Sequence, residues 1–363
     1  MRTRLGIPTV ALAAAVLIGA CSDEGTGPQT REISCGTLDL SLLADGGVGR
    51  DGIPAITDPI FAPVGQDSQT SYLTDASRVI GVFFDGEWLA IPHNIMYQHE
   101  IVNLNGGEQD IAVTYCPLTG SALAFDRAGV EGAEFGVSGL LFQANLIMYD
   151  RNSPNESLWP QMFGQARCGP RDGQVLERHA VVESTWGGFK TLHPDGRVIG
   201  LSPSDAELYN FNPYGGGYEV ATNPDFLGYP IPRDSRRPPK ERVLGVPAAG
   251  ASPPVAFPFE AMTQEGAFYV AEFEHGGAPA AVFWDTDKRA AAAVRPVLDG
   301  QTLTFSVQAD GIFDNETGSK WSVAGESTFG THQGRSLEPI AEAYVAFWEP
   351  WAAFNDGTSL YLE

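Results

Sequence analysis

Short apolar runs, rich in β-branched and aromatic residues, recur along the chain between glycine, aspartate and asparagine residues. Such runs, bounded by turn formers, are typical of strands in a β-rich protein. The clearest predicted strands are residues 111–115, 122–125, 146–149 and 303–307. Two short helices are expected, one after Pro92 that runs through His99 and one over 347–354. The pattern predicts a mainly β fold, sandwich- or barrel-like, with a few short helices.

Several segments recur in the same order about 160 residues apart. Arg-Val-Ile-Gly-Val at 78–82 is followed 164 positions later by Arg-Val-Leu-Gly-Val at 242–246. Looser matches follow in the same order. A period this long predicts a tandem duplication of one β-rich domain. We expect a first copy over 50–227, a Pro/Arg-rich linker over 228–241, and a second, degenerate copy over 242–363.

The N-terminal residues resemble a bacterial lipoprotein signal. Arg2 and Arg4 precede an apolar run over 10–20, which is too short to cross a bilayer and ends at Cys21. We expect cleavage of residues 1–20, lipidation of Cys21 and a tether and N-terminal arm over 21–49; the alternative is a plain signal peptide cleaved nearby. The expected location is the cell envelope, at the periplasmic face or the cell surface, with the membrane as a partner through the lipid.

Composition narrows the class of partner. The 363 residues carry 22 Lys and Arg against 45 Asp and Glu, a formal net charge of −23. Binding to nucleic acid is therefore not expected, because it needs clustered basic residues. At 43% apolar residues the chain has ample material for a core.

The cysteines other than Cys21 pose a pairing question. Cys35, Cys116 and Cys168 form an odd set in an oxidising compartment, so either one pair forms or all three are thiols. A disulfide between Cys35 and Cys168 is the preferred reading, and it leaves Cys116 free. Thr119 stands at the fourth position of the segment Cys-Pro-Leu-Thr at 116–119, so no C-x-x-C dithiol can form there.

Candidate chemistry lies in the first copy alone. Cys116 is expected to end a strand at a tight turn, and His99 with Glu100 to follow a short helix. With Met148 they form a possible thiolate, imidazole, carboxylate and thioether set, which suits copper. A Met in an apolar strand is more often core, however, and a Cys in a β protein is more often buried and inert. His93 is expected on the surface or in a loop, because it does not share a helix face with His99.

Three function classes follow from these residues. The first is binding of a thiophilic metal such as copper. The second is a thiol-dependent enzyme, in which His99 takes the proton of Cys116 and the thiolate attacks an acyl or sulfur substrate. The third is a non-catalytic binding module with a cleft between the copies, beside a basic cluster that more often pairs with neighbouring acids. That cluster comprises Arg233, Arg236, Arg237 and Lys240.

A series of segments resembles the bacterial family DUF3179. They include Val-Thr-Tyr-Cys-Pro-Leu-Thr-Gly at 113–120 and Phe-Gly-Val-Ser-Gly-Leu at 135–140, and together they cover roughly 50–356. The resemblance implies a secreted or membrane-tethered protein and supplies no established activity. The family often has a second Cys where this chain has Thr119, and usually a Trp where it has Gln98; the first departure leaves a site with one cysteine.

Overall fold

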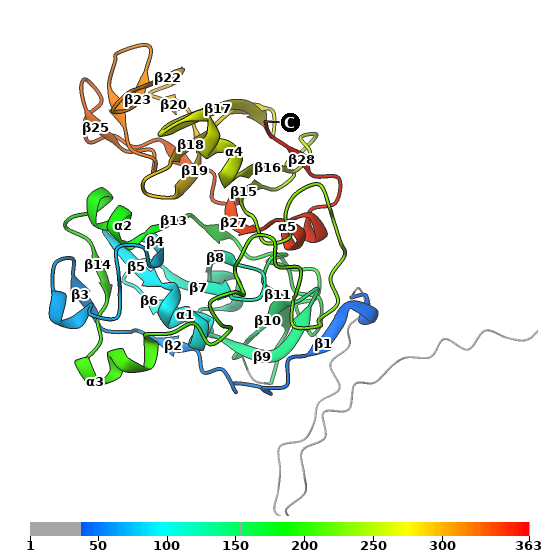
Figure 1. The fold of residues 1–363 in the computed structure, drawn as a ribbon. Coiled ribbons are helices and arrows are strands. Elements are labelled where there is room, and N and C mark those ends of the chain that lie inside the picture. The colour runs from blue at the N-terminus through cyan, green and yellow to red at the C-terminus, as the bar shows by residue number, and fades with distance from the viewer. Residues whose placement is uncertain (1–37, 153, 363) are drawn as a thin grey trace, which may run out of the picture.

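The computed structural model describes residues 38–152 and 154–362. The fold is mainly β, with 40% of residues in strands and 14% in helices, as the sequence pattern predicts. The described part forms a lower body, blue to green in Figure 1, and an upper body, yellow to red. None of the sheets in these residues closes into a barrel.

The lower body contains three sheets. The strands of the first, in spatial order, are β12 (Arg178–His179), β8 (Ser121–Asp126), β7 (Asp110–Cys116), β6 (Ile101–Asn105) and β2 (Ile56–Thr57). Those of the second are β13 (Val181–Thr185), β4 (Arg78–Phe84), β5 (Glu87–Pro92), β14 (Arg197–Ile199) and β3 (Phe61–Pro63). Those of the third are β1 (Leu43–Asp45), β9 (Phe135–Phe142), β10 (Asn145–Asp150) and β11 (Leu158–Pro160).

The upper body is built from three four-stranded sheets and one two-stranded ribbon. The first sheet contains β27 (Tyr344–Phe347), β15 (Arg242–Val246), β16 (Val255–Pro258) and β28 (Ser359–Leu360). The second contains β17 (Phe268–His275), β18 (Ala278–Asp285), β19 (Ala290–Arg295) and β26 (Glu338–Pro339). The third contains β22 (Phe305–Gln308), β23 (Gly311–Asp314), β24 (Lys320–Trp321) and β25 (Ser327–Phe329), and the ribbon pairs β20 (Val297–Leu298) with β21 (Gln301–Thr302).

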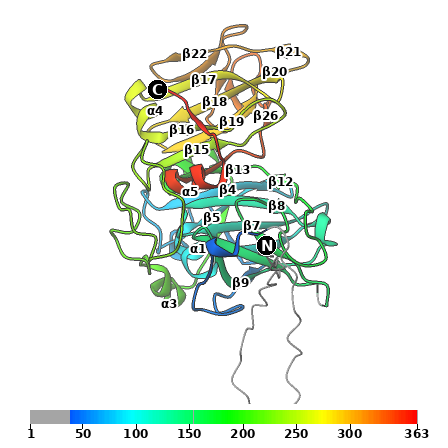
Figure 2. The same ribbon diagram turned by 90° about the vertical axis from the view of Figure 1, so that its right-hand side faces the viewer.

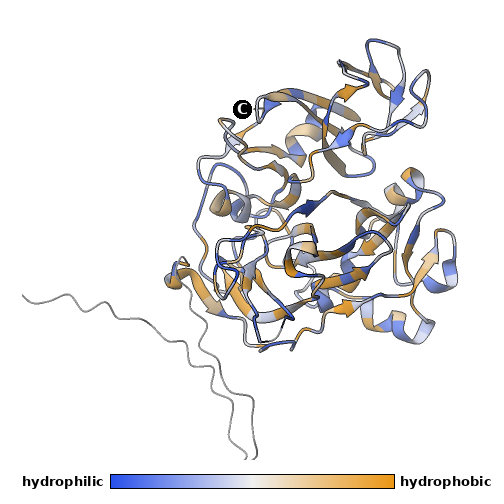
Figure 3. Cartoon of the chain, turned by 180° about the vertical axis from the view of Figure 1, so that it is seen from behind, coloured by the Kyte–Doolittle hydropathy of each residue, from blue (hydrophilic) through white to orange (hydrophobic). Residues whose placement is uncertain are grey.

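The helices are all short. The α-helices are α1 (His93–His99), α2 (Trp186–Leu192), α3 (Pro203–Ala206), α4 (Phe259–Glu265) and α5 (Trp348–Phe354). Four 3₁₀ turns are described: η1 (Leu40–Leu42), η2 (Asp67–Gln69), η3 (Ala128–Val130) and η4 (Glu207–Tyr209). The two predicted helices correspond to α1 and α5, and Pro92 precedes the first residue of α1. Hydrophobic residues, orange in Figure 3, lie mainly on the strands and these helices.

The two bodies repeat one order of elements. In the lower body β4 and β5 form a hairpin that leads into α1, and in the upper body β15 and β16 form a hairpin that leads into α4. Later, β13 leads into α2 as β27 leads into α5. A duplication would leave this order, and the common origin of the halves stays a prediction.

The bodies share one hydrophobic core. The largest cluster of buried residues joins Phe125 and Trp159 of the lower body to Phe347 and Trp351 of the upper one. At the same boundary the Phe347 amide donates to the Thr119 carbonyl at 2.9 Å. In Figure 2, α5 lies between the two bodies. Because apolar surface from both bodies is buried together, their separation would expose it to water.

Two segments cover the side of the lower body that carries β9. We call residues 43–57 the strap and residues 207–241 the connector. The strap pairs with β9 through β1 and with β6 through β2. The connector contains the predicted linker 228–241 and packs partly buried aromatic residues, among them Tyr214 and Tyr229, against the shared core.

Candidate functional site

The backbone at Glu100 sets the geometry of the candidate site. Helix α1 ends because Glu100 adopts a left-handed conformation with φ of 57°. Such a residue commonly terminates a helix, although a side chain larger than glycine makes it costly. The Glu100 carbonyl accepts from the Tyr115 amide at 2.8 Å, so the helix end is joined to β7 one residue before Cys116. The sequence therefore brings Glu100 and Cys116 into one neighbourhood.

Cys116 is a neutral, buried thiol. Its side chain is fully buried in the shared core, where its Sγ accepts from the Leu146 amide at 3.3 Å and faces the Ala144 carbonyl at 3.7 Å. Burial, with the nearby Glu100 carboxyl, raises the pKa of the thiol to about 11. Nucleophilic attack and metal binding both need the thiolate, which this environment disfavours.

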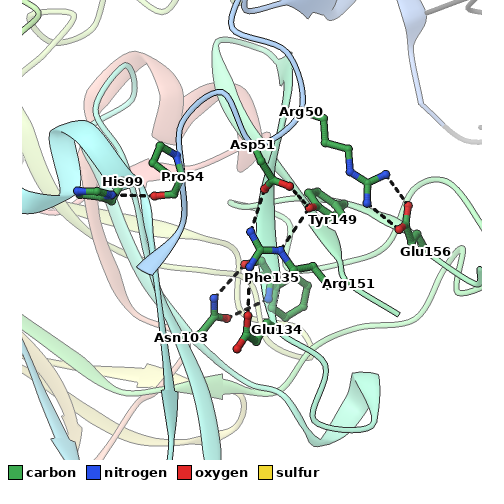
Figure 4. A network of polar contacts seen from close by, with 10 residues as sticks. All are labelled: Arg50, Asp51, Pro54, His99, Asn103, Glu134, Phe135, Tyr149, Arg151 and Glu156. Atoms are coloured by element: carbon green, nitrogen blue, oxygen red, sulfur yellow. Dashed lines mark hydrogen bonds and ion pairs between the residues drawn. The ribbon is translucent and has the colours of Figure 1, made fainter. Parts of the chain in front are cut away.

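Both ring nitrogens of His99 form hydrogen bonds with residues other than Cys116. Nδ1 is 2.7 Å from the Pro54 carbonyl oxygen and Nε2 is 2.7 Å from the Tyr209 hydroxyl. Because a carbonyl only accepts, Nδ1 carries the proton and Nε2 accepts from Tyr209. The ring therefore joins the strap to the connector, and the strap side of this contact is visible in Figure 4. Burial lowers the pKa of the imidazole. No hydrogen bond joins His99 to Cys116 within the described ranges.

Met148 lies in the middle of β10, fully buried in the shared core. It stands opposite Val137 on one neighbouring strand and Trp159 on the other. This is the packing role that an apolar strand methionine usually has.

A pocket of about 160 Å³ lies beneath the strap and the connector. The side chains that line it are mostly apolar, and the Glu100 carboxyl is its one ordinarily acidic group. The lining residues are Gly46, Val48, Ile53, Glu100, Leu118, Val137, Gly139, Leu140, Leu141, Leu146, Tyr214, Leu227 and Tyr229. Val48 and Leu227 are about half exposed, so they form the rim of the pocket.

Glu100 is only 5% exposed, and no hydrogen bond or ion pair of its carboxyl is found in the described part of the chain. Burial raises the pKa of this carboxyl to about 8, so it is mostly protonated at neutral pH. A buried acid without a partner at the wall of a pocket is a candidate ligand-binding group.

Polar pairs hold the strap in place over the pocket. Arg50 and Glu156 form a two-bonded ion pair, with 2.6 Å and 2.8 Å contacts. Asp51 accepts from Arg151 at 2.9 Å and from the Tyr149 hydroxyl. Figure 4 shows these pairs along one side of the strap. These pairs therefore fasten the strap between Val48 and Ile53, two of its residues that line the pocket.

The predicted metal set is only partly assembled. Glu100 and Cys116 are neighbours, whereas the His99 nitrogens are bonded elsewhere and Met148 is core. Within 38–152 and 154–362, no group of three or more His, Cys, Asp or Glu side chains is placed to hold a metal ion. Copper binding stays a prediction.

The predictions for the N-terminus fall largely outside the described residues. Cys168 is disulfide-bonded and Cys116 is free. Cys35, the predicted partner of Cys168, lies outside the described residues, as do Cys21 and the signal segment. In the described part no helix has the length and apolar character to span a bilayer.

Most of the basic cluster pairs with acids, as the sequence analysis favours. Arg233 pairs with Glu349, Arg236 with Asp234 and Arg237 with Glu241. The fourth member behaves differently. Lys240 is buried, donates to the Tyr218 and Asp225 carbonyls, and lies 3.1 Å from the centre of the Tyr218 ring.

The prediction that His93 lies on the surface or in a loop is wrong. His93 is the first residue of α1 and is 1% exposed. Its ring packs on Tyr115 with centroids 4.1 Å apart, and its Nε2 lies 3.5 Å from Glu183 Oε2. The reason is long-range, because β13, β15 and the connector bring charged groups to this end of the helix.

A buried charge network therefore lies between the bodies. Glu183 accepts from Arg78 Nε at 2.7 Å and lies 3.4 Å from Arg242, which in turn pairs with Glu219 at 2.7 Å. Sequence reasoning missed this network, although the arginine that opens each Arg-Val-x-Gly-Val segment was a signal for it.

We expect Cys116 to be nearly inert in the native protein. With a thiol pKa of about 11, the thiolate fraction at pH 8 is roughly 200-fold below that of free cysteine. Alkylation by iodoacetamide, followed residue by residue with peptide mass spectrometry, should be at least that much slower than for free cysteine and should recover in urea. A native rate near that of free cysteine would instead support the thiol enzyme.

The comparisons agree with the resemblance of the motifs. The family described as "Protein of unknown function (DUF3179)" matches residues 50–358. No curated protein and no solved structure matches the chain significantly. The match begins within the strap and covers the connector and nearly all of both bodies, and the chain therefore belongs to the DUF3179 family.

Proposed function

We propose that this protein is a binding module that holds a small, mainly apolar organic molecule in the pocket beside Glu100 and Cys116. The observation that carries the proposal is the combination of an apolar lining with one buried carboxyl group that has no partner among the residues the structure describes. Ligand pockets usually combine a hydrophobic wall with a few placed polar groups. The proposed setting is the cell envelope, at the periplasmic face of a bacterial membrane or at the cell surface, with the lipid on Cys21 as the anchor.

The size of the pocket limits the ligand. At about 160 Å³ it is close to an engineered apolar cavity of about 150 Å³ that binds benzene. A six-membered ring with one short substituent matches this space, and a longer molecule would extend past the rim at Val48 and Leu227. The strap and the connector would shield the bound part from water.

Binding is favoured over thiol catalysis because of the state of Cys116. A thiol enzyme needs a base within reach of the sulfur and a lowered thiol pKa. The His99 nitrogens are bonded to Pro54 and Tyr209, and the pKa of Cys116 is raised. Copper binding remains a separate proposal, and metal analysis of wild type and Cys116→Ser tests it directly.

The test fills the rim of the pocket with a larger side chain. A panel of one-ring compounds is screened by ligand-observed NMR against wild type, Val48→Trp and Val307→Trp. Val48 lines the pocket, while Val307 is a similarly exposed valine on β22 of the upper body. We expect Val48→Trp to weaken binding at least tenfold and Val307→Trp to leave it unchanged. The proposal fails if nothing in the panel binds, or if both variants bind like wild type.

A further inference from the structure

We infer that the ligand of this pocket is an organic ammonium ion, with its cationic group against the Glu100 carboxylate and its apolar part among the pocket's hydrophobic side chains. This inference rests on the proposed binding function and names the chemical class of the ligand. It begins from Glu100, the one carboxylic acid in the apolar wall, whose carboxyl group has no hydrogen-bond or ion-pair partner in the described part of the chain.

The other buried glutamates show what Glu100 lacks. Three further glutamates are buried in the described residues, and each pairs with arginine. These pairs are Glu183 with Arg78, Glu241 with Arg237 and Glu349 with Arg233. Glu100 has no such cation within the described ranges. Because a buried carboxylate is costly without a positive partner, a cation from outside would complete the pattern.

The rest of the pocket suits a cation. No lysine or arginine is among its lining residues, so no basic side chain in the wall would repel a positive ligand. Tyr214 and Tyr229 present aromatic rings, and an ammonium group is attracted to the face of such a ring. The formal charge of −23 also favours the approach of cations over anions.

Other titratable groups near Glu100 do not change this conclusion. Cys116 stays a neutral thiol, Tyr214 keeps its proton because burial raises its pKa, and His99 is neutral at pH 7 because burial lowers its pKa. Glu100 is therefore the group in the pocket whose charge can change near neutral pH.

The main alternative to an ammonium ligand is a carboxylic acid, because such an acid could form hydrogen bonds with the protonated Glu100. At pH 7 an ammonium ligand requires Glu100, with a pKa of about 8, to ionise, which weakens binding about tenfold. A carboxylate ligand with an ordinary pKa of about 4.5 would itself have to be protonated, which weakens binding roughly 300-fold at the same pH. Protonation alone therefore disfavours the carboxylate ligand more than the ammonium ion at neutral pH.

The experiment compares three probes of the same shape: cyclohexylmethylamine, cyclohexylmethanol and cyclohexanecarboxylate. Their affinities for the wild-type protein are measured by NMR titration at pH 6, 7 and 8. We expect the amine to bind best at pH 8, with an affinity that rises about ninefold from pH 6 to 7 and about fivefold from pH 7 to 8, because Glu100 must lose a proton. The alcohol should bind more weakly and with no pH dependence.

Two variants identify the titrating group. Glu100→Gln should weaken amine binding at least tenfold at pH 8, abolish its pH dependence and leave the alcohol within twofold. Cys116→Ser should keep the pH dependence. If the alcohol or the carboxylate binds as well as the amine, the ligand class is wrong while the binding function stands. If none of the three binds, both are overturned.

Discussion

Replacing Glu183 by glutamine should lower the free energy of unfolding by about 3–5 kcal/mol at pH 7. Glu183 is 1% exposed on β13 and holds Arg78, at 2.6 Å, and Arg242, at 3.4 Å, between the two bodies. The substitution keeps the shape of the side chain but leaves arginine charge buried and undercompensated. Urea unfolding, followed by tryptophan fluorescence, measures the loss.

A surface pair provides the matched control. Glu156 and Arg50 also form a close ion pair, but Arg50 is 53% exposed. Solvent screens such pairs, so Glu156→Gln should cost no more than about 1 kcal/mol. Arg78→Met combined with Glu183→Gln should cost less than the sum of the two single losses, because the orphaned charge is removed. Equal losses for Glu183→Gln and Glu156→Gln would show that the network contributes little.

The contribution of Glu183 depends on pH in a defined direction. Its arginine partners and His93 hold the pKa of Glu183 well below its usual range. A lowered carboxyl pKa stabilises the fold above the ordinary glutamate pKa of about 4.3, and this stabilisation is lost as the pH falls toward the folded-state value. The difference between wild type and Glu183→Gln should therefore be complete above about pH 5 and shrink in acid.

Glu100→Gln should have the opposite effect and make the protein more stable in mild alkali. The pKa of Glu100 is about 8 in the folded protein, against 4.5 for an unperturbed glutamate. The folded state therefore binds more protons than the unfolded state between these values, so wild-type stability falls as the pH rises. Relative to the variant, this amounts to about 3–5 kcal/mol between pH 4.5 and 9.

Urea unfolding of wild type and Glu100→Gln at pH 5 and pH 9 tests this expectation. The two proteins should differ little at pH 5, and the variant should be the more stable at pH 9. Replacing the exposed Glu265 by glutamine is the control, and its stability should run parallel to wild type at both pH values. A parallel result for Glu100→Gln would mean that its carboxyl is not desolvated as described.

Local patterns were sufficient for the four strands predicted by residue range, one of them only in part, and for two of the five α-helices in the described residues. The predicted strand 111–115 lies within β7, Asp110–Cys116, and the predicted 146–149 within β10, Asn145–Asp150. These elements alternate with turn formers, and their burial follows from their own composition. For 303–307 only the later residues pair, because β22 begins at Phe305.

The site was harder to predict because distant segments decide it. His99 was expected to face Cys116. Instead, helix α1 ends in the left-handed turn at Glu100, and the His99 imidazole forms hydrogen bonds with Pro54 and Tyr209. The burial of His93 depends on Glu183, which lies 90 residues away. Neither a capping conformation of glutamate nor a pairing over that separation leaves a periodic signal in the sequence.

The position of His99 has a consequence for how a bound molecule enters and leaves the pocket. Its ring contacts the strap through Pro54 and the connector through Tyr209, and both segments line the pocket. When this side chain rotates away, the two coverings lose a common fastening at the same moment. The strap keeps its ion pairs to Glu156 and Arg151, so we expect this rotation to couple the motions of the two coverings and not by itself to release a guest.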